Sequence, residues 1–478
     1  MRLSRLIEGI SDIRIENYQD IEITSVTAES ERTRPGSLFV AINGSKFNGG
    51  DFIIPAYMRG ARVFVSSEKT PVLKNATLIC SKYPRKTLAE LCANLNGNPQ
   101  KKMLFVGITG TKGKTTTAFL LSSILDGIGV KNLVVGTLGI IGAENIETKN
   151  TTPDPTVLFP VFKNAYHKGC KVVILEISSQ ALKDYRVYGI PFDCVAFTGL
   201  GHDHVGEDEH PSFSDYIFSK RSLFCSYGAK RAVVNADDAY SLYMSSEVPK
   251  VVRCGFSSNA DFVIENYTDS QRGSKFTLCG VPIICSLPGI YNARNVSVAL
   301  ALAHEITGRR ICEISKYVSS ATVPGRFNYI NILGRNIIID YAHNKESMRE
   351  IINLSRRLFG KKIICVYGSV GGRSFARRRE LAEVAEELAD LSVITSDNPC
   401  FELPLSICAD IYSSFKDKTK AKIIVDREEA INYAIREAQM GDSVLILGKG
   451  HETSINICGK CIPFSDAGVV DKLKREAL

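Results

Sequence analysis

The stretch GITGTKGKTTT, residues 107–117, decides the fold at the centre of this chain. It follows the apolar run MLFV and precedes AFLLSSIL, so a glycine-rich loop joins a buried strand to an apolar-periodic helix. Such a loop presents backbone N–H groups at the positive end of a helix dipole, where phosphate oxygens bind. In the common loop, G-x-x-x-x-G-K-[ST], a glycine stands five residues before the second glycine, which here would be residue 108. Residue 108 is Ile, so the stretch departs from the common pattern. It nevertheless predicts a phosphate-binding loop.

The residue types in this loop suit a nucleoside triphosphate. Gly110 and Gly113 permit phosphate oxygens to approach the backbone closely. Lys114 can reach the β- and γ-phosphates, and the hydroxyl of Thr115 can coordinate Mg²⁺. A glycine turn without this chemistry would not need Lys-Thr at the start of the helix. We therefore expect a nucleotide and Mg²⁺ as ligands.

Strands and helices alternate on the C-terminal side of the loop. NLVVG, KVVILE, CVAF and RAVVN are β-branched runs separated by helical segments, which predicts a mostly parallel sheet with helices on both faces. Four further runs, RNIIID, KKIICVYGS, LSVITS and DSVLILG, follow a join at residues 323–330 and predict a second unit of this kind. Short strands and turns precede the polar segment 94–102. The sequence thus predicts an α/β protein of three domains: a small α/β domain (1–98), a central P-loop domain (99–325) and a Rossmann-like domain (326–478).

Composition excludes several classes of protein. The 478 residues are 44% hydrophobic and 23% charged, which excludes a disordered chain. No apolar run reaches the ~18 residues of a membrane span, and the first residues lack the apolar core of a signal peptide. The 14 cysteines are scattered, several of them in apolar runs, which favours reduced thiols over disulfides. We expect a cytoplasmic protein.

Polar residues follow the strand KVVILE. Its last residue, Glu176, is placed to help hold Mg²⁺, because the carboxyl ends of parallel strands meet at one edge of a sheet. Ser178 and Ser179 can equally cap the next helix. His202, His204 and His210 fall within nine residues, which indicates either a metal or substrate role or structural histidines. Cys458 and Cys461 lack a second ligand pair nearby, so we expect a hairpin turn there and no zinc site.

Taken together, these residues resemble the Mur ligase family of ATP-dependent enzymes, which build the peptidoglycan stem peptide. GTKGKTT is similar to the family's compressed loop, G-T-x-G-K-[ST]-T. The resemblance covers nearly the whole chain, and its motifs are SLFVAINGSKFNGGDFI, NTTPDP, EISSQAL, HDHVGEDEHPSFSDYIFSKRSLF, NADD, PGIYNARN, PGRF, DYAHN, DNP and GKGHE. It implies a ligase that adds a diamino acid to UDP-N-acetylmuramoyl-L-alanyl-D-glutamate. The N-terminal, central and C-terminal domains would bind UDP, ATP and the amino acid respectively.

The resemblance also implies a role for each matching residue. Those that would bind ATP are Gly110, Thr111, Gly113, Lys114, Thr115, Thr116, Asn292, Asn295, Arg326, Asp340 and His343. Those that would hold Mg²⁺, at two sites, are Thr115, Glu176, His204 and Lys220 if carbamylated. Those that would contact the UDP-sugar peptide are Ser30, Gly44, Gly49, Thr151, Thr152, Ser178 and Arg186, and those near the amino acid are Arg378, Arg379, Asp397, Asn398 and Glu452. Lys114, Lys220 and His204 would be catalytic.

The motif DNP decides which diamino acid we expect. Diaminopimelate-adding members carry D-N-P-R, whose Arg binds the second carboxylate of that amino acid. Here residue 400 is Cys, and GEDEHPSFSDYIFSK resembles the lysine-adding subtype. GKGHE, with Glu452, resembles the diaminopimelate subtype instead, and Arg378 or Arg379 suits the α-carboxylate of either substrate. We expect L-lysine, with meso-2,6-diaminopimelate or ornithine as alternatives.

Other classes of function make distinct predictions. A nucleic-acid-dependent P-loop ATPase would need a basic, aromatic-bearing groove, and the cluster 377–379 is the sole hint of one in the sequence. A non-catalytic binding protein would have lost the loop lysine or the acid, and a folylpolyglutamate synthase would lack the uridine-type start. We therefore expect a monomeric enzyme with neither a nucleic-acid nor a membrane partner.

Overall fold

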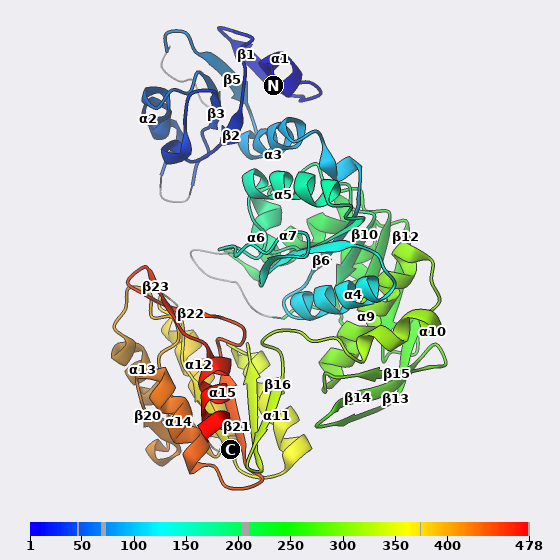
Figure 1. The fold of residues 1–478 in the computed structure, drawn as a ribbon, viewed down its shortest axis with the longest axis vertical. Coiled ribbons are helices and arrows are strands. Elements are labelled where there is room, and N and C mark those ends of the chain that lie inside the picture. The colour runs from blue at the N-terminus through cyan, green and yellow to red at the C-terminus, as the bar shows by residue number, and fades with distance from the viewer. Residues whose placement is uncertain (45–46, 68–72, 202–209, 373, 477–478) are drawn as a thin grey trace. The chain divides into compact units, whose positions relative to one another are not determined.

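The computed structural model describes residues 1–44, 47–67, 73–201, 210–372 and 374–476. The strands of this part of the chain form three sheets and one separate hairpin (Figure 1). The contacts divide the chain into two compact units. The first comprises residues 1–265, 277–283 and 294–319, and the second comprises residues 266–276, 284–293 and 320–478. The predicted domain boundaries stay predictions, because this division is not a division into three.

The N-terminal sheet has the strand order β1-β5-β4-β3-β2. Its strands are β1 (Ile13–Glu16), β2 (Ser25–Thr27), β3 (Ser37–Val40), β4 (Val63–Ser66) and β5 (Thr77–Ser81). Its helices are α1 (Leu3–Leu6), η1 (Ser30–Arg32), η2 (Gly49–Phe52), α2 (Ile53–Met58) and α3 (Pro84–Leu95). Side chains alternate across β3: Leu38 packs in the cluster that includes α3, whereas Phe39 packs in the cluster that includes α2. Helices therefore cover both faces.

The central sheet has the order β15-β14-β13-β12-β11-β10-β6-β9-β7-β8. Its strands are β6 (Leu104–Thr109), β7 (Asn132–Gly136), β8 (Gly139–Ile141), β9 (Val172–Glu176), β10 (Cys194–Phe197), β11 (Arg231–Asn235), β12 (Lys250–Gly255), β13 (Phe262–Ser270), β14 (Gly273–Leu278) and β15 (Val281–Cys285). Its helices are η3 (Pro99–Lys101), α4 (Lys114–Gly127), α5 (Pro155–His167), α6 (Ser179–Lys183), α7 (Phe213–Cys225), α8 (Ser241–Ser245), α9 (Ile290–Thr307), α10 (Ile311–Ile314) and η4 (Ser315–Val318). The pairs from β7 through β9, β6, β10, β11 and β12 to β13 are parallel.

Register in the central sheet brings the expected residues to one edge. Ile108 pairs with Glu176, and Thr109 pairs with Phe197, so β6, β9 and β10 end side by side. Phe105 packs edge-on against Phe162 of α5, while α4 lies on the opposite face of the sheet (Figure 1). The glycine loop after β6 therefore begins beside Glu176, as the sequence predicts for a parallel sheet.

The C-terminal sheet has the order β16-β17-β21-β18-β19-β20, and β22 pairs with β23 in a hairpin. The strands are β16 (Asn328–Ile332), β17 (Arg335–Asp340), β18 (Ile363–Tyr367), β19 (Leu391–Ile394), β20 (Ala421–Ile423), β21 (Ser443–Leu447), β22 (Ser454–Ile457) and β23 (Lys460–Pro463). The helices are α11 (Lys345–Phe359), α12 (Phe375–Leu388), α13 (Pro404–Ser413), η5 (Lys418–Lys420), α14 (Arg427–Glu437) and α15 (Asp466–Glu476). Cys365 of β18 packs with α11 to α13, and its neighbours Ile364 and Val366 pack with α14 and α15. The predicted α/β class, with helices on both sheet faces, is confirmed.

No helix in the described part of the chain combines the length and the apolarity needed to span a bilayer.

Candidate active site

The glycine loop turns sharply between β6 and α4. Gly110 and Gly113 have φ angles of 150° and 85°, in the region that favours glycine. A Cβ on Gly110 would lie 2.1 Å from Oγ1 of Thr198, and one on Gly113 would lie 2.4 Å from Oδ1 of Asn295. Conformation and space therefore both require glycine at these positions, and Gly113 directly precedes the first residue of α4.

Two ammonium groups converge on one carbonyl of this loop. Nζ of Lys114 donates to the Gly110 oxygen at 2.8 Å, and Nζ of Lys220 donates to the same oxygen at 3.0 Å. Lys220 comes from α7, is 2% exposed, and lies with its nitrogen 4.6 Å from the centre of the Tyr216 ring. Two positive charges beside the N-terminus of α4 favour a bound anion.

Hydrogen bonds fix the rest of the loop against β10 and α7. The backbone N–H of Thr111 donates to the oxygen of Gly199, and its hydroxyl lies 2.9 Å from that of Tyr216. The same hydroxyl accepts the N–H of Gly201 at 2.9 Å. Thr116 is buried in the first turn of α4. The loop is thus held from the helix that carries Lys220.

Glu176 is fully buried at the end of β9 beside the loop. Its Oε2 accepts the hydroxyl of Thr115 at 2.7 Å and that of Thr137 at 3.1 Å, and its Oε1 accepts the Thr137 N–H at 3.1 Å. Burial raises the pKa of Glu176, which these hydrogen bonds and the nearby Lys114 partly counteract. A Cβ on Gly136 would lie 1.9 Å from Oε1, so a glycine makes room for the carboxylate.

Residues expected at the sugar peptide gather next to Glu176. The hydroxyl of Thr152 donates to the Glu176 backbone oxygen at 2.8 Å and accepts the N–H of Ser178 at 3.1 Å. Ser178 caps α6, as its alternative interpretation predicts. Arg186 donates to the oxygen of Thr152 at 3.0 Å and pairs with Asp184 at 3.1 Å. The structure therefore brings Thr152, Ser178 and Arg186 together.

Thr151 joins the same group, because its hydroxyl lies 3.2 Å from that of Thr137.

The residues expected near uridine lie at turns of the N-terminal sheet. Gly49 donates its N–H to Oδ1 of Asn43 at 2.8 Å, and a Cβ there would lie 2.4 Å from the nitrogen of Ile42. The N–H of Gly44 donates to the oxygen of Phe47 at 3.0 Å, and Ser30 begins η1. The close approach of backbone to backbone explains the glycine at residue 49.

Asn292 and Asn295 are three residues apart on α9, and hence on one face of that helix. The side chain of Asn292 donates to the oxygen of Pro288 at 2.7 Å. Asn295 lies against the glycine loop, as the spacing to Gly113 shows.

Arg326, Asp340 and His343 surround the start of the C-terminal sheet. Asp340 ends β17 and accepts the N–H groups of Phe327 and Ala342, each at 2.8 Å. The guanidinium of Arg326 lies 5.0 Å from the centre of the Tyr341 ring, and its Nε is buried without a hydrogen bond among the described residues. Nδ1 of His343 lies 2.8 Å from the Tyr341 oxygen. Arg326, Asp340 and His343 therefore lie close to the carboxyl end of β17.

Asp397, Asn398 and Glu452 meet at the carboxyl ends of β19 and β21. The side-chain N–H₂ of Asn398 donates to Oε2 of Glu452 at 2.8 Å, and Lys449 donates to the same oxygen at 2.6 Å. Burial raises the pKa of Asp397, while Arg427 and Lys449 counteract the rise. The three residues expected near the amino acid therefore belong to one polar network.

Arg378 and Arg379 are engaged with acids of their own domain. Arg378 is buried and pairs with Glu402 at 2.8 Å and with Asp410 at 2.7 Å. Arg379 lies on the exposed face of α12 and pairs with Glu383 at 2.7 Å. Their predicted contact with a carboxylate stays a prediction, because these pairs would compete with it.

Comparisons with known proteins match three domain families to successive parts of the chain. The Mur ligase family catalytic domain matches residues 22–95, the Mur ligase middle domain residues 108–303, and the Mur ligase glutamate ligase domain residues 325–450. The UDP-N-acetylmuramoyl-L-alanyl-D-glutamate–2,6-diaminopimelate ligase of Aquifex aeolicus is 36% identical over 94% of this chain and 93% of its own length. This chain belongs to the Mur ligase family.

Two further relatives agree with that assignment. The enzyme of the same name from Bacillus licheniformis is 34% identical over 99% of both chains. A solved structure of a ligase of that name superimposes with a TM-score of 0.70 at 26% identity, covering 99% of this chain and 98% of the other. The fold is thus that of a three-domain Mur ligase, and the chain is an ATP-dependent acid–amino-acid ligase that forms ADP.

The expectation of an L-lysine-adding Mur ligase is wrong. The similar curated relatives are named as 2,6-diaminopimelate ligases, which favours the alternative stated from the sequence. The expectation depended on the side chain at residue 400 and on the likeness of GEDEHPSFSDYIFSK to the lysine-adding subtype. A carboxylate can, however, be held by any set of suitably placed donors. Cys400 has a φ of 54°, and its backbone bonds to Asn456 and Cys458, so it joins the β22–β23 hairpin.

Several metal-related predictions can be placed. His204 and His202 lie outside the described residues. His210 is described and buried, with Nδ1 2.6 Å from Asp215 and Nε2 2.8 Å from Ser179. Cys458 lies in the turn between β22 and β23, so the predicted hairpin is confirmed. Within the described ranges, no three His, Cys, Asp or Glu side chains gather as a metal site.

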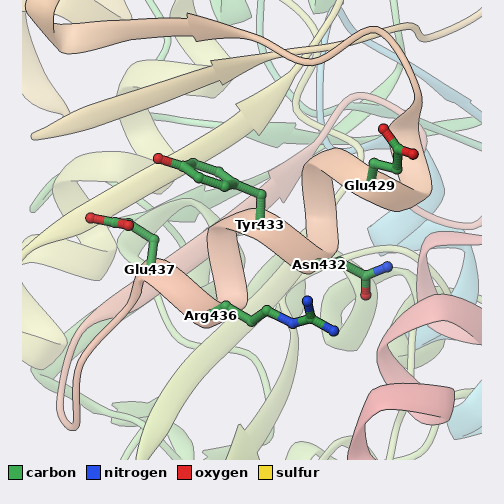
Figure 2. A pocket seen from close by; sticks show the side chains of 5 residues that line it. All are labelled: Glu429, Asn432, Tyr433, Arg436 and Glu437. Atoms are coloured by element: carbon green, nitrogen blue, oxygen red, sulfur yellow. The ribbon is translucent and has the colours of Figure 1, made fainter.

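One surface hollow is lined by none of these residues. Figure 2 shows Glu429, Tyr433 and Glu437 along one side of α14 and Asn432 and Arg436 along the other. A single helix supplies every lining side chain, and none of the predicted site residues is among them. The hollow therefore adds nothing to the Mur ligase site.

Sequence reasoning missed Thr137, Tyr216 and Lys449. Thr137 follows β7, an apolar strand that ends at the same sheet edge as β9, and Tyr216 lies one helical turn before Lys220. These two positions in the sequence could have identified Thr137 and Tyr216. Lys449 stands inside the quoted motif GKGHE, but nothing in the sequence shows that it is buried.

Proposed function

We propose that this Mur ligase adds meso-2,6-diaminopimelate to the D-glutamate of UDP-N-acetylmuramoyl-L-alanyl-D-glutamate during the synthesis of peptidoglycan precursors. The observation that carries the proposal is the near full-length likeness to ligases named for this reaction, at up to 36% identity. The loop with its two lysines and the Thr115–Glu176 pair supports it, because these groups suit the phosphates of ATP.

The reaction needs no enzyme nucleophile. The terminal carboxylate of the UDP-dipeptide attacks the γ-phosphorus of ATP, the bond to the β-phosphate oxygen breaks, and ADP leaves. The amine of the amino acid then attacks the resulting acyl phosphate, phosphate departs, and the amine loses its proton. Lys114 lies on the loop carbonyl, where its charge would oppose the repulsion between two anions.

Each substrate has a group of candidate contacts. Ser30, Gly44 and Gly49 would bind the uridine end, and Thr151, Thr152, Ser178 and Arg186 the sugar peptide. Arg186 suits the peptide carboxylates because its guanidinium is held by Asp184 and the Thr152 oxygen. Glu452 suits an ammonium of the amino acid. Because Cys400 cannot pair with a carboxylate, the proposal requires other donors for the second carboxylate of diaminopimelate.

The residues beside the loop fit Mg²⁺. The hydroxyl of Thr115 and the carboxylate of Glu176 are oxygen donors, which Mg²⁺ prefers, and they already lie 2.7 Å apart. Lys220 would add a third oxygen donor if its amine were carbamylated, and His204 is the other proposed ligand. Bound Mg²⁺ would neutralise phosphate charge.

Product mass tests the proposal directly. The pure protein is incubated with ATP, Mg²⁺, the UDP-dipeptide and an equimolar mixture of meso-diaminopimelate, L-lysine and L-ornithine, and the products are weighed by mass spectrometry. A product heavier by a diaminopimelyl residue, with ADP in equal amount, is expected. A lysyl or ornithyl product would refute the proposed amino acid, and ATP hydrolysis stimulated by nucleic acid alone would refute the reaction. Lys114→Met serves as the inactive control.

We also propose that the enzyme acts as a monomer in the cytoplasm. Light scattering during gel filtration tests the first part, and a dimer mass at working concentration would contradict it.

A further inference from the structure

Lys449 is a lysine with no exposed surface. It follows Gly448 at the end of β21, between two sheet strands and the β22–β23 hairpin of the C-terminal unit. A buried ammonium is costly unless nearby acceptors and opposite charges compensate it. The contacts of Lys449 therefore indicate its role.

The contacts of Lys449 are the residues expected to meet the amino acid. Nζ donates to Oε2 of Glu452 at 2.6 Å and to Oδ1 of Asn398 at 3.3 Å, and Oδ1 of Asp397 lies 3.9 Å away. The buried ammonium of Lys449 thus contacts the side chains of Glu452 and Asn398 and lies near Asp397, the acid of the DNP motif.

The side chain of Asn398 has one fixed orientation in this network. Its oxygen accepts both Nζ of Lys449 and the N–H of Asn456, the latter at 2.9 Å. Its nitrogen must then face Glu452, to which it donates at 2.8 Å. An amide nitrogen has two N–H groups, so one of them remains for a ligand.

The carboxylate of Glu452 is oriented in the same way. Oε2 accepts both Lys449 and Asn398, whereas Oε1 accepts no hydrogen bond from the described residues. The side chain is 29% exposed, in contrast to the buried Lys449. Lys449 therefore turns one oxygen of Glu452 inward and leaves the other for an ammonium.

A second buried ion pair belongs to the same cluster of charged residues. Arg427 and Asp466 have no exposed side-chain surface and pair at 2.7 Å, and Arg427 also donates to the oxygens of Ser396 and Leu447. Together with Lys449, Asp397 and Glu452, the cluster holds two cations and three acids. The excess negative charge suits a site for a cationic group.

We propose that Lys449 is a positioning residue that orients Asn398 and Glu452 for the incoming diamino acid and has no contact of its own with the reacting atoms. The inference rests on the proposed function, since it assigns those two residues to the amino-acid site. Loss of Lys449 would remove one of the two donors to the Asn398 oxygen and one of the two donors to Oε2 of Glu452, and would leave Glu452 and Asp397 to repel each other. Affinity for the amino acid would fall, while the nucleotide and UDP-dipeptide sites would keep their contacts.

Steady-state kinetics of Lys449→Met and Lys449→Gln test the proposal. The KM for meso-diaminopimelate is expected to rise about tenfold to a hundredfold in the Met variant, the effect of losing charge-assisted hydrogen bonds, and less in the Gln variant, which keeps a donor. The KM values for ATP and the UDP-dipeptide should stay within about twofold of wild type by the same reasoning. Lys472→Met, which removes an exposed lysine paired with Glu428, is the matched control and should change none of them.

Three outcomes overturn the proposal: an unchanged KM for the amino acid in a folded variant, an equal rise of all three KM values, or failure of both variants to fold. Wild-type protein without amino-acid-dependent ADP release would refute the proposed function instead, so the two failures are distinct.

Discussion

The hydroxyl of Thr115 donates to the carboxylate of Glu176 at 2.7 Å, although 61 residues separate the two. The bond joins the first turn of α4 to the end of β9 and places the two proposed oxygen ligands in contact. The bond also holds a buried carboxylate beside the loop, where a bound cation would balance its charge.

This relationship predicts opposite effects of Glu176→Gln on stability and activity. Because burial raises the pKa of Glu176, the folded protein retains the proton more strongly than the unfolded chain. Stability then falls as pH rises from the unfolded pKa toward the folded one, and at neutral pH the acid destabilises the fold. The variant should melt at a higher temperature without ligands, yet lose about a hundredfold or more in kcat. Calorimetry and ADP release measure the two effects, and a lower melting temperature at pH 7 would contradict the first.

Gly113→Ala should abolish nucleotide binding. The new Cβ would lie 2.4 Å from Asn295, in a backbone conformation with a φ of 85° that alanine rarely adopts. Gly129→Ala is a matched control, because Gly129 has a φ of 75° with no atom within 4 Å of an added Cβ. The control should lose about 1 kcal/mol of stability and keep its affinity for ATP. Equal affinities of the two variants for ATP, measured by titration calorimetry, would contradict the proposed role of the loop in nucleotide binding.

Arg186→Met should raise the KM for the UDP-dipeptide by about tenfold or more, since a guanidinium held by Asp184 and Thr152 would no longer meet a carboxylate. The partly exposed Arg349, paired with Glu387, supplies the control Arg349→Met, which should leave all KM values unchanged. An effect confined to the KM for ATP would contradict the proposed contact between Arg186 and the UDP-dipeptide.

Lys220→Ala should lose nearly all turnover, and formate or acetate should restore part of it if a carbamate is the active form. Full activity of the variant would exclude that role, and mass spectrometry of the intact wild-type protein in bicarbonate gives an independent measurement.

The stability of the C-terminal unit should depend on His451 in acid. Burial, together with the charge of the neighbouring Arg326, lowers the pKa of His451 to about 4. The unfolded chain therefore binds a proton that the folded chain does not, so the contribution of His451 falls as pH drops from about 6.5 toward 4. His451→Gln should lose less stability than wild type over that range. Denaturant titrations at several pH values would show parallel losses if the prediction is wrong.

The sequence alone determined the alternation of strands and helices, the glycine loop and the family. Local rules suffice there: β-branched runs bounded by glycine make strands, and Gly110, Gly113, Lys114 and Thr115 are adjacent in the chain. The same rules failed for the diamino acid, because they weighed Cys400 and the stretch GEDEHPSFSDYIFSK above Glu452 of GKGHE.

Only the tertiary structure decided which distant residues act together. Parallel register, not spacing, brings Glu176 to Thr115, and helix α7 brings Lys220 to the Gly110 carbonyl. Burial of Lys449 behind Asn398 and Glu452 follows from the meeting of β19, β21 and the β22–β23 hairpin. A sequence records residue types, whereas hydrogen bonds and desolvation depend on distances that only the packed chain sets.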